Sequence, residues 1–192
     1  ERMKADGVRR VAVQPTLLLG GIEYERLLRV VQGCTGFCAA TGKPLVAGQE
    51  DCEALASAIM AEHPLVQDEA LLLMGHGTEH AANHVYHALQ EAFDKNGYRG
   101  FIGTVEGEPS FMDAVARLTA SASTRARLLP LMFVAGEHAK SDMAGEQEGS
   151  FLTCAQAAGI AAHPVLRGLG ESEAIRALYV RRVEAALREV ER

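Results

Sequence analysis

The feature that most constrains the fold is an apolar run that ends abruptly at a histidine held between two glycines. Residues 70–80 read Ala-Leu-Leu-Leu-Met-Gly-His-Gly-Thr-Glu-His. The apolar stretch 71–74 is typical of a parallel strand that is covered on both faces. Gly75 and Gly77 allow tight backbone turns and leave space around His76. Because the next segment has a helical pattern, we expect His76 at the carboxyl edge of a sheet, where open α/β sheets bind their ligands.

Strand-like and helix-like patterns alternate along the whole chain. This alternation predicts an α/β fold with parallel sheets and helices on both faces. We expect residues 139–150 to form a polar loop and, if there are two lobes, a division near Pro64. The expected strands are 8–14, 44–46, 70–74, 101–106, 127–136 and 160–166, and the expected helices are 22–32, 51–62, 80–93, 110–121, 151–158 and 172–192.

Composition and charge exclude several classes of partner. The chain has 192 residues, a net charge of -6 and an isoelectric point of about 5.7, which argues against a nucleic-acid surface. No apolar run reaches the roughly 18 residues that a membrane helix needs. The sequence also lacks a Gly-x-x-x-x-Gly-Lys-Ser/Thr loop and a Gly-x-Ser-x-Gly elbow, so nucleotide binding and serine-hydrolase chemistry lose support.

The cysteines and the start of the chain bear on its compartment. Two close cysteines could bind a metal, but no second pair completes a zinc site, so we expect four free thiols and a reducing, cytoplasmic compartment. Residues 1–7 read as the last turn of a helix closing on glycine. A lost export signal and a periplasmic location are therefore an open alternative. The four cysteines are Cys34, Cys38, Cys52 and Cys154.

Three predicted strands end in a side chain that can bind a metal or move a proton. These are His76, Glu106 and His138. Neighbouring parallel strands bring their carboxyl ends to one edge, so we expect these groups to converge. Two histidines and a carboxylate suit Co²⁺, Ni²⁺, Fe²⁺ or Zn²⁺, and neutral imidazole also accepts protons near pH 7. The alternative is that each is an isolated exposed residue.

Other titratable groups lie near these positions. His80 is a candidate for a pocket wall, and His84 and His87 are interpreted as exposed helix residues, since a His-Glu-x-x-His motif is absent. Glu23 opens the predicted helix 22–32, where it either caps helix amides or faces the site as an acid or base. Three acidic residues follow His138, and we interpret them as part of a solvated loop. They are Asp142, Glu146 and Glu148.

Several separated blocks together resemble one family, the anaerobic cobalt chelatases. These are the sirohydrochlorin cobaltochelatases of the cobalamin pathway, in the class II chelatase group. The resemblance runs from about residue 8 to the C-terminus. It rests on the blocks 11–25, 74–80, 105–109, 129–139 and 168–172.

The resemblance implies two similar α/β lobes that face each other across a tetrapyrrole cleft. The first lobe would comprise residues 1–63 joined by the C-terminal helix 172–192, and the second, residues 64–171, would carry the metal site. The family's leading strand and helix have no counterpart here, so the first lobe would be incomplete at its start. A homo-oligomer is an open alternative.

The resemblance also implies an activity, which is insertion of Co²⁺ into sirohydrochlorin without ATP and without an organic cofactor. The family's metal-binding positions fall on His76, Glu106 and His138, and its further active-site glutamate falls on Glu23. Fe²⁺ or Ni²⁺ are alternative metals. Iron insertion for sirohaem, a metal or tetrapyrrole carrier, and a small metal-dependent hydrolase are alternative functions.

Overall fold

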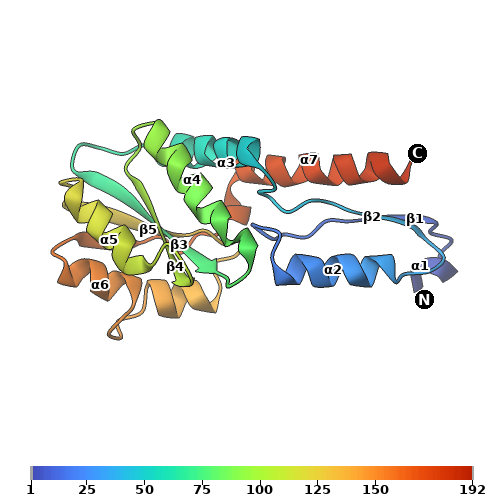
Figure 1. The fold of residues 1–192 in the computed structure, drawn as a ribbon, viewed down its shortest axis with the longest axis horizontal. Coiled ribbons are helices and arrows are strands. Elements are labelled where there is room, and N and C mark those ends of the chain that lie inside the picture. Colours follow the sequence, from blue (N-terminus) through green and yellow to red (C-terminus); the bar gives the residue numbers. More distant parts are fainter. Residues whose placement is uncertain (1, 192) are drawn as a thin grey trace.

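Two parallel β-sheets lie toward opposite ends of an elongated molecule (Figure 1). The computed structural model describes residues 2–191. The larger sheet has the strand order β4-β3-β5-β6, and the smaller one pairs β1 with β2. All of these pairs are parallel, which confirms the predicted fold class. The strands are β1 (Arg10–Val13), β2 (Cys38–Thr41), β3 (Glu69–Gly77), β4 (Gly100–Glu106), β5 (Arg125–Pro130) and β6 (Ala161–Pro164).

Helices cover both sheets, and short helical turns occur in three of the connections. The turns are Ala81–Asn83, the π-helical turn Ala139–Met143, and Leu169–Glu171. None of the helices between residues 2 and 191 is long and apolar enough to cross a membrane. The helices are α1 (Arg2–Ala5), α2 (Ile22–Gln32), α3 (Gln49–Glu62), α4 (His84–Lys95), α5 (Phe111–Ala120), α6 (Phe151–Ala157) and α7 (Glu173–Val190).

The apolar run of β3 is the centre of the larger core. Successive side chains of a strand point to opposite faces, so the run serves both. Leu71 and Leu73 belong to the cluster formed with α3, α4 and the start of α7, whereas Leu72 and Met74 belong to the cluster formed with α5 and α6. Each of the four is at most 1% exposed. Burying one such side chain contributes about 1.5–3 kcal/mol, so this strand needs both helical layers.

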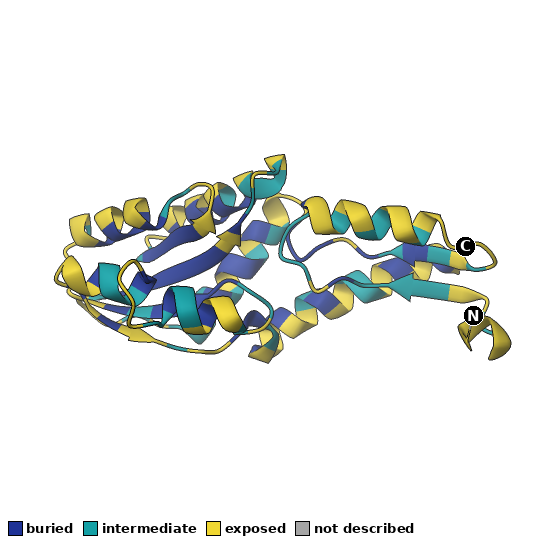
Figure 2. Cartoon of the chain, turned by 90° about the horizontal axis from the view of Figure 1, so that it is seen from below, coloured by how far each residue is buried: buried dark blue, intermediate teal, exposed yellow. Residues whose placement is uncertain are grey.

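The smaller sheet is covered by α2 and by the second half of α7. Ala12 and Ala40 from its strands meet Ala186 and Val190 of α7 in a small separate cluster. The first half of α7 packs instead in the larger core, so this helix joins the two ends of the molecule (Figure 1). Figure 2 shows the difference in burial, with the strands of the larger sheet largely buried and the smaller end mostly intermediate or exposed. The division into lobes at residues 63 and 64 stays a prediction.

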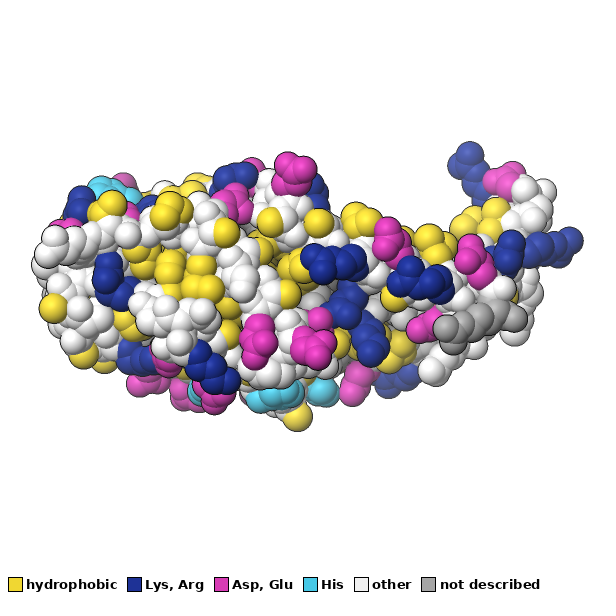
Figure 3. All heavy atoms as spheres, turned by 90° about the horizontal axis from the view of Figure 1, so that it is seen from above, with side chains coloured by type: hydrophobic (Ala, Val, Ile, Leu, Met, Phe, Trp, Pro, Cys, Tyr) yellow, Lys and Arg dark blue, Asp and Glu magenta, His cyan; other side chains and the backbone are white. Residues whose placement is uncertain are grey.

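The surface carries charges of both signs. On the face shown in Figure 3, basic side chains gather over the narrower half that holds the second half of α7, interspersed with acidic ones. All four cysteines are free, as the sequence predicted.

Two predicted strands differ from those observed. Residues 44–46 form no strand; the backbone N–H groups of Leu45 and Val46 donate instead to two carbonyls in the loop after β1, and the second strand of the small sheet lies earlier, at Cys38–Thr41. The predicted strand 127–136 stops at Pro130. Beyond it, the carbonyls of Met132 and Phe133 accept from the turn at residues 169–170 and no longer face a neighbouring strand.

The predicted loop 139–150 is wrong in its first five residues. Residues Ala139–Met143 form a π-helical turn. Ala139 and Met143 are both 0% exposed and belong to the cluster beneath α5 and α6. Two apolar side chains four residues apart therefore anchor this segment to the core, despite its polar surroundings.

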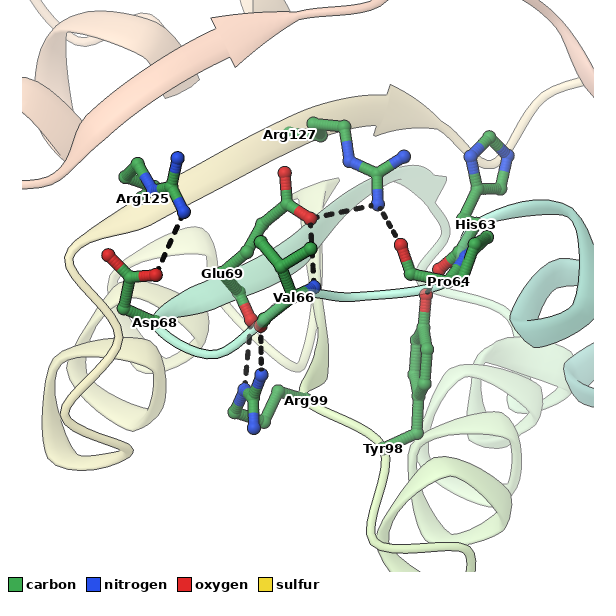
Figure 4. A network of polar contacts seen from close by, with 9 residues as sticks. All are labelled: His63, Pro64, Val66, Asp68, Glu69, Tyr98, Arg99, Arg125 and Arg127. Carbon is green, nitrogen blue, oxygen red and sulfur yellow. Dashed lines mark hydrogen bonds and ion pairs between the residues drawn. The ribbon is translucent and has the colours of Figure 1, made fainter.

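A network of polar contacts holds the loop that precedes β3, at the amino edge of the larger sheet (Figure 4). The Arg99 guanidinium donates to the carbonyls of Val66 and Glu69, at 2.6 and 2.9 Å. Arg127 donates to the Pro64 carbonyl at 2.8 Å and lies 3.2 Å from the Glu69 carboxylate. These contacts fix where β3 begins, and its other end carries His76.

A hydrogen bond from Tyr98 to the start of this loop can be tested by mutation. The Tyr98 hydroxyl donates to the His63 carbonyl at 2.6 Å, so Tyr98→Phe should lower the free energy of unfolding by about 1 kcal/mol. Urea unfolding measures this change. The matched control is Tyr24→Phe, because the Tyr24 hydroxyl has no hydrogen-bond partner within residues 2–191. Equal losses in the two variants would contradict the assigned role of the Tyr98 hydroxyl.

Candidate functional site

His76 is exposed close to the end of β3, where a buried tyrosine supports the backbone. The Tyr86 hydroxyl accepts a hydrogen bond from the Gly77 N–H at 3.2 Å. A Cβ on Gly75 would lie 2.3 Å from the Tyr86 ring, so only glycine leaves room for that ring. Burial raises the pKa of Tyr86, so its hydroxyl stays protonated at neutral pH.

Gly77 brings the ends of β3 and β4 together. It pairs with Glu106 in the ladder, and a Cβ on Gly77 would lie 1.5 Å from the Glu106 carbonyl oxygen. Its φ of +80° also favours glycine. The last residue of β4, Glu106, therefore lies beside the residue that follows His76, as neighbouring parallel strands predict.

His138 reaches the same edge by a different route from the predicted one. It does not end a strand; β5 stops at Pro130, and His138 caps the π-helical turn eight residues later. Its ring nevertheless meets that of His76, with centroids 4.7 Å apart and planes at 88°. The structure thus brings the two predicted histidines together.

The hydrogen bonds of these two rings assign their protons. His76 Nδ1 lies 3.1 Å from the Gly77 carbonyl oxygen, and His138 Nδ1 lies 2.5 Å from a carboxylate oxygen of Asp142. A carbonyl and a carboxylate only accept, so both Nδ1 atoms must donate. In the neutral rings each Nε2 then keeps its lone pair, which is what binds a metal or a proton.

His80 has the opposite arrangement. Its Nδ1 accepts from the Ala82 N–H at 3.0 Å, so its proton lies on Nε2, which faces Glu25 Oε1 at 3.2 Å. No lone pair remains for a metal. His80 instead joins the loop after β3 to the first turn of α2. His84 and His87 are exposed on the first turns of α4, as predicted.

The two predicted glutamates lie in different surroundings. Glu106 is exposed on the strand next to His76. Glu23 is exposed in the first turn of α2, and one of its carboxylate oxygens lies 3.9 Å from the place of a Cβ on Gly21. Within residues 2–191, no three His, Cys, Asp or Glu side chains are gathered closely enough to hold an ion. Joint ligation by His76, Glu106 and His138 therefore stays a prediction.

Several exposed apolar side chains lie near the predicted site residues in the sequence. Met112 and Val134 are 62% and 67% exposed, and Ile22 and Val105 are each 38% exposed. They come from the start of α5, the loop before His138, the start of α2 and the end of β4. Val105 and Met112 also line a hollow of about 630 Å³. The same hollow is lined by Asp142, Gln147 and Glu148, so it offers a ligand both apolar and polar contacts.

Sequence reasoning missed Tyr86, and it interpreted Asp142 as part of a solvated loop and not as a partner of His138. The four-residue spacing of His138 and Asp142 was a readable signal, because such pairs share one side of a helical turn. Tyr86 gave no signal, since its role depends on a contact with Gly75 that only the packed structure shows.

A family model and two curated relatives all point to cobalt chelatases. The family model for cobalt chelatase (CbiK) matches residues 1–188. A sirohydrochlorin cobaltochelatase of Salmonella typhimurium is 36% identical over 190 residues, which cover 97% of this chain and 72% of that protein. The sirohydrochlorin cobaltochelatase CbiKC of Nitratidesulfovibrio vulgaris is 35% identical, covering 97% of this chain and 68% of that protein.

Two solved structures share the fold. SirB from Bacillus subtilis with Fe³⁺ superposes with a TM-score of 0.66 at 14% identity, covering 98% of this chain and 76% of that one. A multi-domain protein of Deinococcus radiodurans, described as structurally similar to chelatases, gives 0.56 at 20% identity, covering 94% of this chain and 41% of that one. At these identities the likeness concerns the fold alone.

The close approach at Gly77 can be tested against a glycine of the same conformation. Gly159 has φ +81° and no atom within 4 Å of the place of a Cβ, whereas Gly77 has φ +80° and the Glu106 carbonyl in the way. Gly77→Ala should therefore cost about 1–3 kcal/mol more than Gly159→Ala, because overpacking adds to the shared backbone strain. Urea unfolding of both variants measures the difference. Equal costs would show that β3 and β4 do not approach this closely.

Proposed function

The chain belongs to the cobalt chelatase (CbiK) family, and from that premise we propose that it inserts Co²⁺ into sirohydrochlorin. The reaction needs no ATP and no organic cofactor, and the metal is a substrate. One observation carries the proposal, which is the His76–His138 pair with a free Nε2 lone pair on each ring. The 35–36% identity to two sirohydrochlorin cobaltochelatases supports the choice of substrate.

The first proposed step is metal capture. The Nε2 atoms of His76 and His138 replace part of the water shell of Co²⁺, and imidazole nitrogen suits such borderline divalent ions. Glu106, at the end of the neighbouring strand, is the proposed third ligand. Because two lone pairs and one carboxylate leave coordination positions open, the metal can pass on to the ring nitrogens.

The second step is proton transfer. Entry of a divalent metal releases two pyrrole protons from the macrocycle. As the metal leaves His76 and His138, each freed Nε2 can take one of them, since neutral imidazole accepts protons near pH 7. Glu23, exposed at the start of α2, is the proposed further acceptor.

Substrate binding is proposed to use exposed apolar side chains of the elements that carry the site. Val105, Met112 and Val134 would contact the face of the macrocycle, whose removal from water favours binding. The acidic side chains of sirohydrochlorin need a cation. Lys140 is exposed two residues after His138, and no ion pair involves it within residues 2–191. Arg167 is already paired with Glu62 at 2.9 Å, so Lys140 is the better candidate.

Three further points complete the proposal. Fe²⁺ and Ni²⁺ share the ligand preferences of Co²⁺, so the assay must rank the metals.

A non-catalytic carrier of metal or tetrapyrrole would bind its ligand stoichiometrically without turnover. The four free cysteines support a cytoplasmic location.

The central test is an anaerobic insertion assay followed by absorbance, with sirohydrochlorin and Co²⁺, Fe²⁺ or Ni²⁺ added separately. We expect His76→Ala and His138→Ala each to lower the catalysed rate by about 100-fold or more. His87→Ala is the matched control, because His87 is exposed on α4. A rate in either site variant equal to that of the control would reject the proposal, and stoichiometric binding without turnover would favour the carrier.

The two glutamates should respond differently if their proposed roles are right. Glu106→Gln removes a charged ligand and should raise the KM for Co²⁺ by about 10-fold. Glu23→Gln removes a proton acceptor and should lower kcat while leaving the affinity for Co²⁺ unchanged. Steady-state kinetics and direct Co²⁺ titration separate the two effects, with Glu184→Gln, an exposed position on α7, as a control for charge. Identical effects of the two substitutions would contradict this division.

A further inference from the structure

We propose that Asp142 is a positioning residue for His138. Its carboxylate holds the proton on His138 Nδ1 and thereby keeps the Nε2 lone pair free and aimed at the edge where His76 lies. This inference rests on the proposed function for its consequence in catalysis. The positioning itself is a property of the metal-free protein and can be measured without any activity.

The π-helical turn sets the two residues side by side. His138 stands at the start of the turn and Asp142 four residues later, and the Nδ1–Oδ2 distance is 2.5 Å. The turn is anchored from below by Ala139 and Met143, both 0% exposed. The backbone that carries both side chains is therefore fixed by the core.

The rest of the turn also restrains the carboxylate. The Ser141 hydroxyl donates to the Glu137 carbonyl at 2.9 Å, and its oxygen lies 3.2 Å from Oδ1, the second carboxylate oxygen of Asp142. The Ser141 carbonyl accepts from the Gly145 N–H at 3.0 Å and from the Gln147 side chain at 2.7 Å. These bonds hold the backbone of the turn from which Oδ2 of Asp142 reaches the imidazole.

His76 explains why His138 needs such a partner. The strand supplies His76 with the Gly77 carbonyl, which holds Nδ1 at 3.1 Å. His138 lies outside any strand, and Asp142 provides the one hydrogen bond found for its ring within residues 2–191. The Asp142 carboxylate, four residues after His138, therefore accepts the Nδ1 hydrogen bond that the Gly77 carbonyl accepts from His76. Such partners of ligating histidines fix the tautomer and the ring orientation.

The direct test reads the tautomer. Long-range ¹H–¹⁵N correlation spectra of ¹⁵N-labelled protein distinguish Nδ1–H, Nε2–H and the doubly protonated ring, and they are recorded over a range of pH so that the neutral form is observed. A His138→Gln spectrum identifies the His138 signals. We expect Nδ1–H in the wild type, and a shift toward Nε2–H in Asp142→Asn, whose amide can donate to Nδ1. Asp142→Glu, which restores a carboxylate, should return the signal toward Nδ1–H.

The second arm measures Co²⁺ affinity and insertion. Asp142→Asn keeps the shape of the side chain, so a purely structural role predicts no change. A positioning role predicts a loss of about 10–100-fold in both quantities, with partial recovery in Asp142→Glu. Glu146→Gln makes the same change of charge four residues away on an exposed position and should leave both unchanged. Thermal unfolding checks that each variant is folded.

The outcomes separate the two proposals. Nε2–H on wild-type His138, or an unchanged tautomer in Asp142→Asn, overturns the positioning role. A shifted tautomer with reduced Co²⁺ affinity supports it. A shifted tautomer with unchanged insertion sustains the positioning of His138 by Asp142 and instead rejects the proposed part of His138 in chelation.

Discussion

The close approach of β3 and β4 at Gly77 is the constraint on which the site depends. A single added carbon there would lie 1.5 Å from the Glu106 carbonyl oxygen. Because successive residues of a strand point to opposite faces, His76 is exposed while its neighbours Gly75 and Gly77 are buried beside Tyr86. The buried residues 71–74 hold the middle of the same strand from both faces. The exposed imidazole of His76 therefore lies near the end of β3, a strand that is held by the core on both faces.

The two histidines are held by different kinds of backbone, yet they present the same nitrogen. His76 is fixed by a strand whose own carbonyl accepts from Nδ1, and His138 by a π-helical turn whose Asp142 does so. Both elements are attached to the core on the α5 and α6 side of the sheet, through Met74 in one case and Ala139 and Met143 in the other. A shared core layer therefore sets the 4.7 Å separation of the rings.

Much of this arrangement could be predicted from the sequence, because local patterns dictate it. The apolar run before His76, the helix expected at 110–121 and the helix 22–32 are local features, and the structure has each of them. The end of β5 at Pro130 depends on a distant turn that pairs with Met132 and Phe133, so no local pattern revealed it. The predicted convergence of His138 with His76 was correct, but the predicted strand that would carry it was not.

His76 and His138 are histidines whose rings meet at the carboxyl edge of the larger sheet, with an Nε2 lone pair free on each neutral ring. His80 has committed its lone pair to the Ala82 N–H, and His63 lies at the opposite edge beside the loop before β3. Within residues 2–191 no third ligand closes around His76 and His138. A closed cage would retain its ion, whereas two imidazole nitrogens with the proposed ligand Glu106 leave coordination positions open through which the ion can pass on. This openness is what insertion into a macrocycle requires of its metal site.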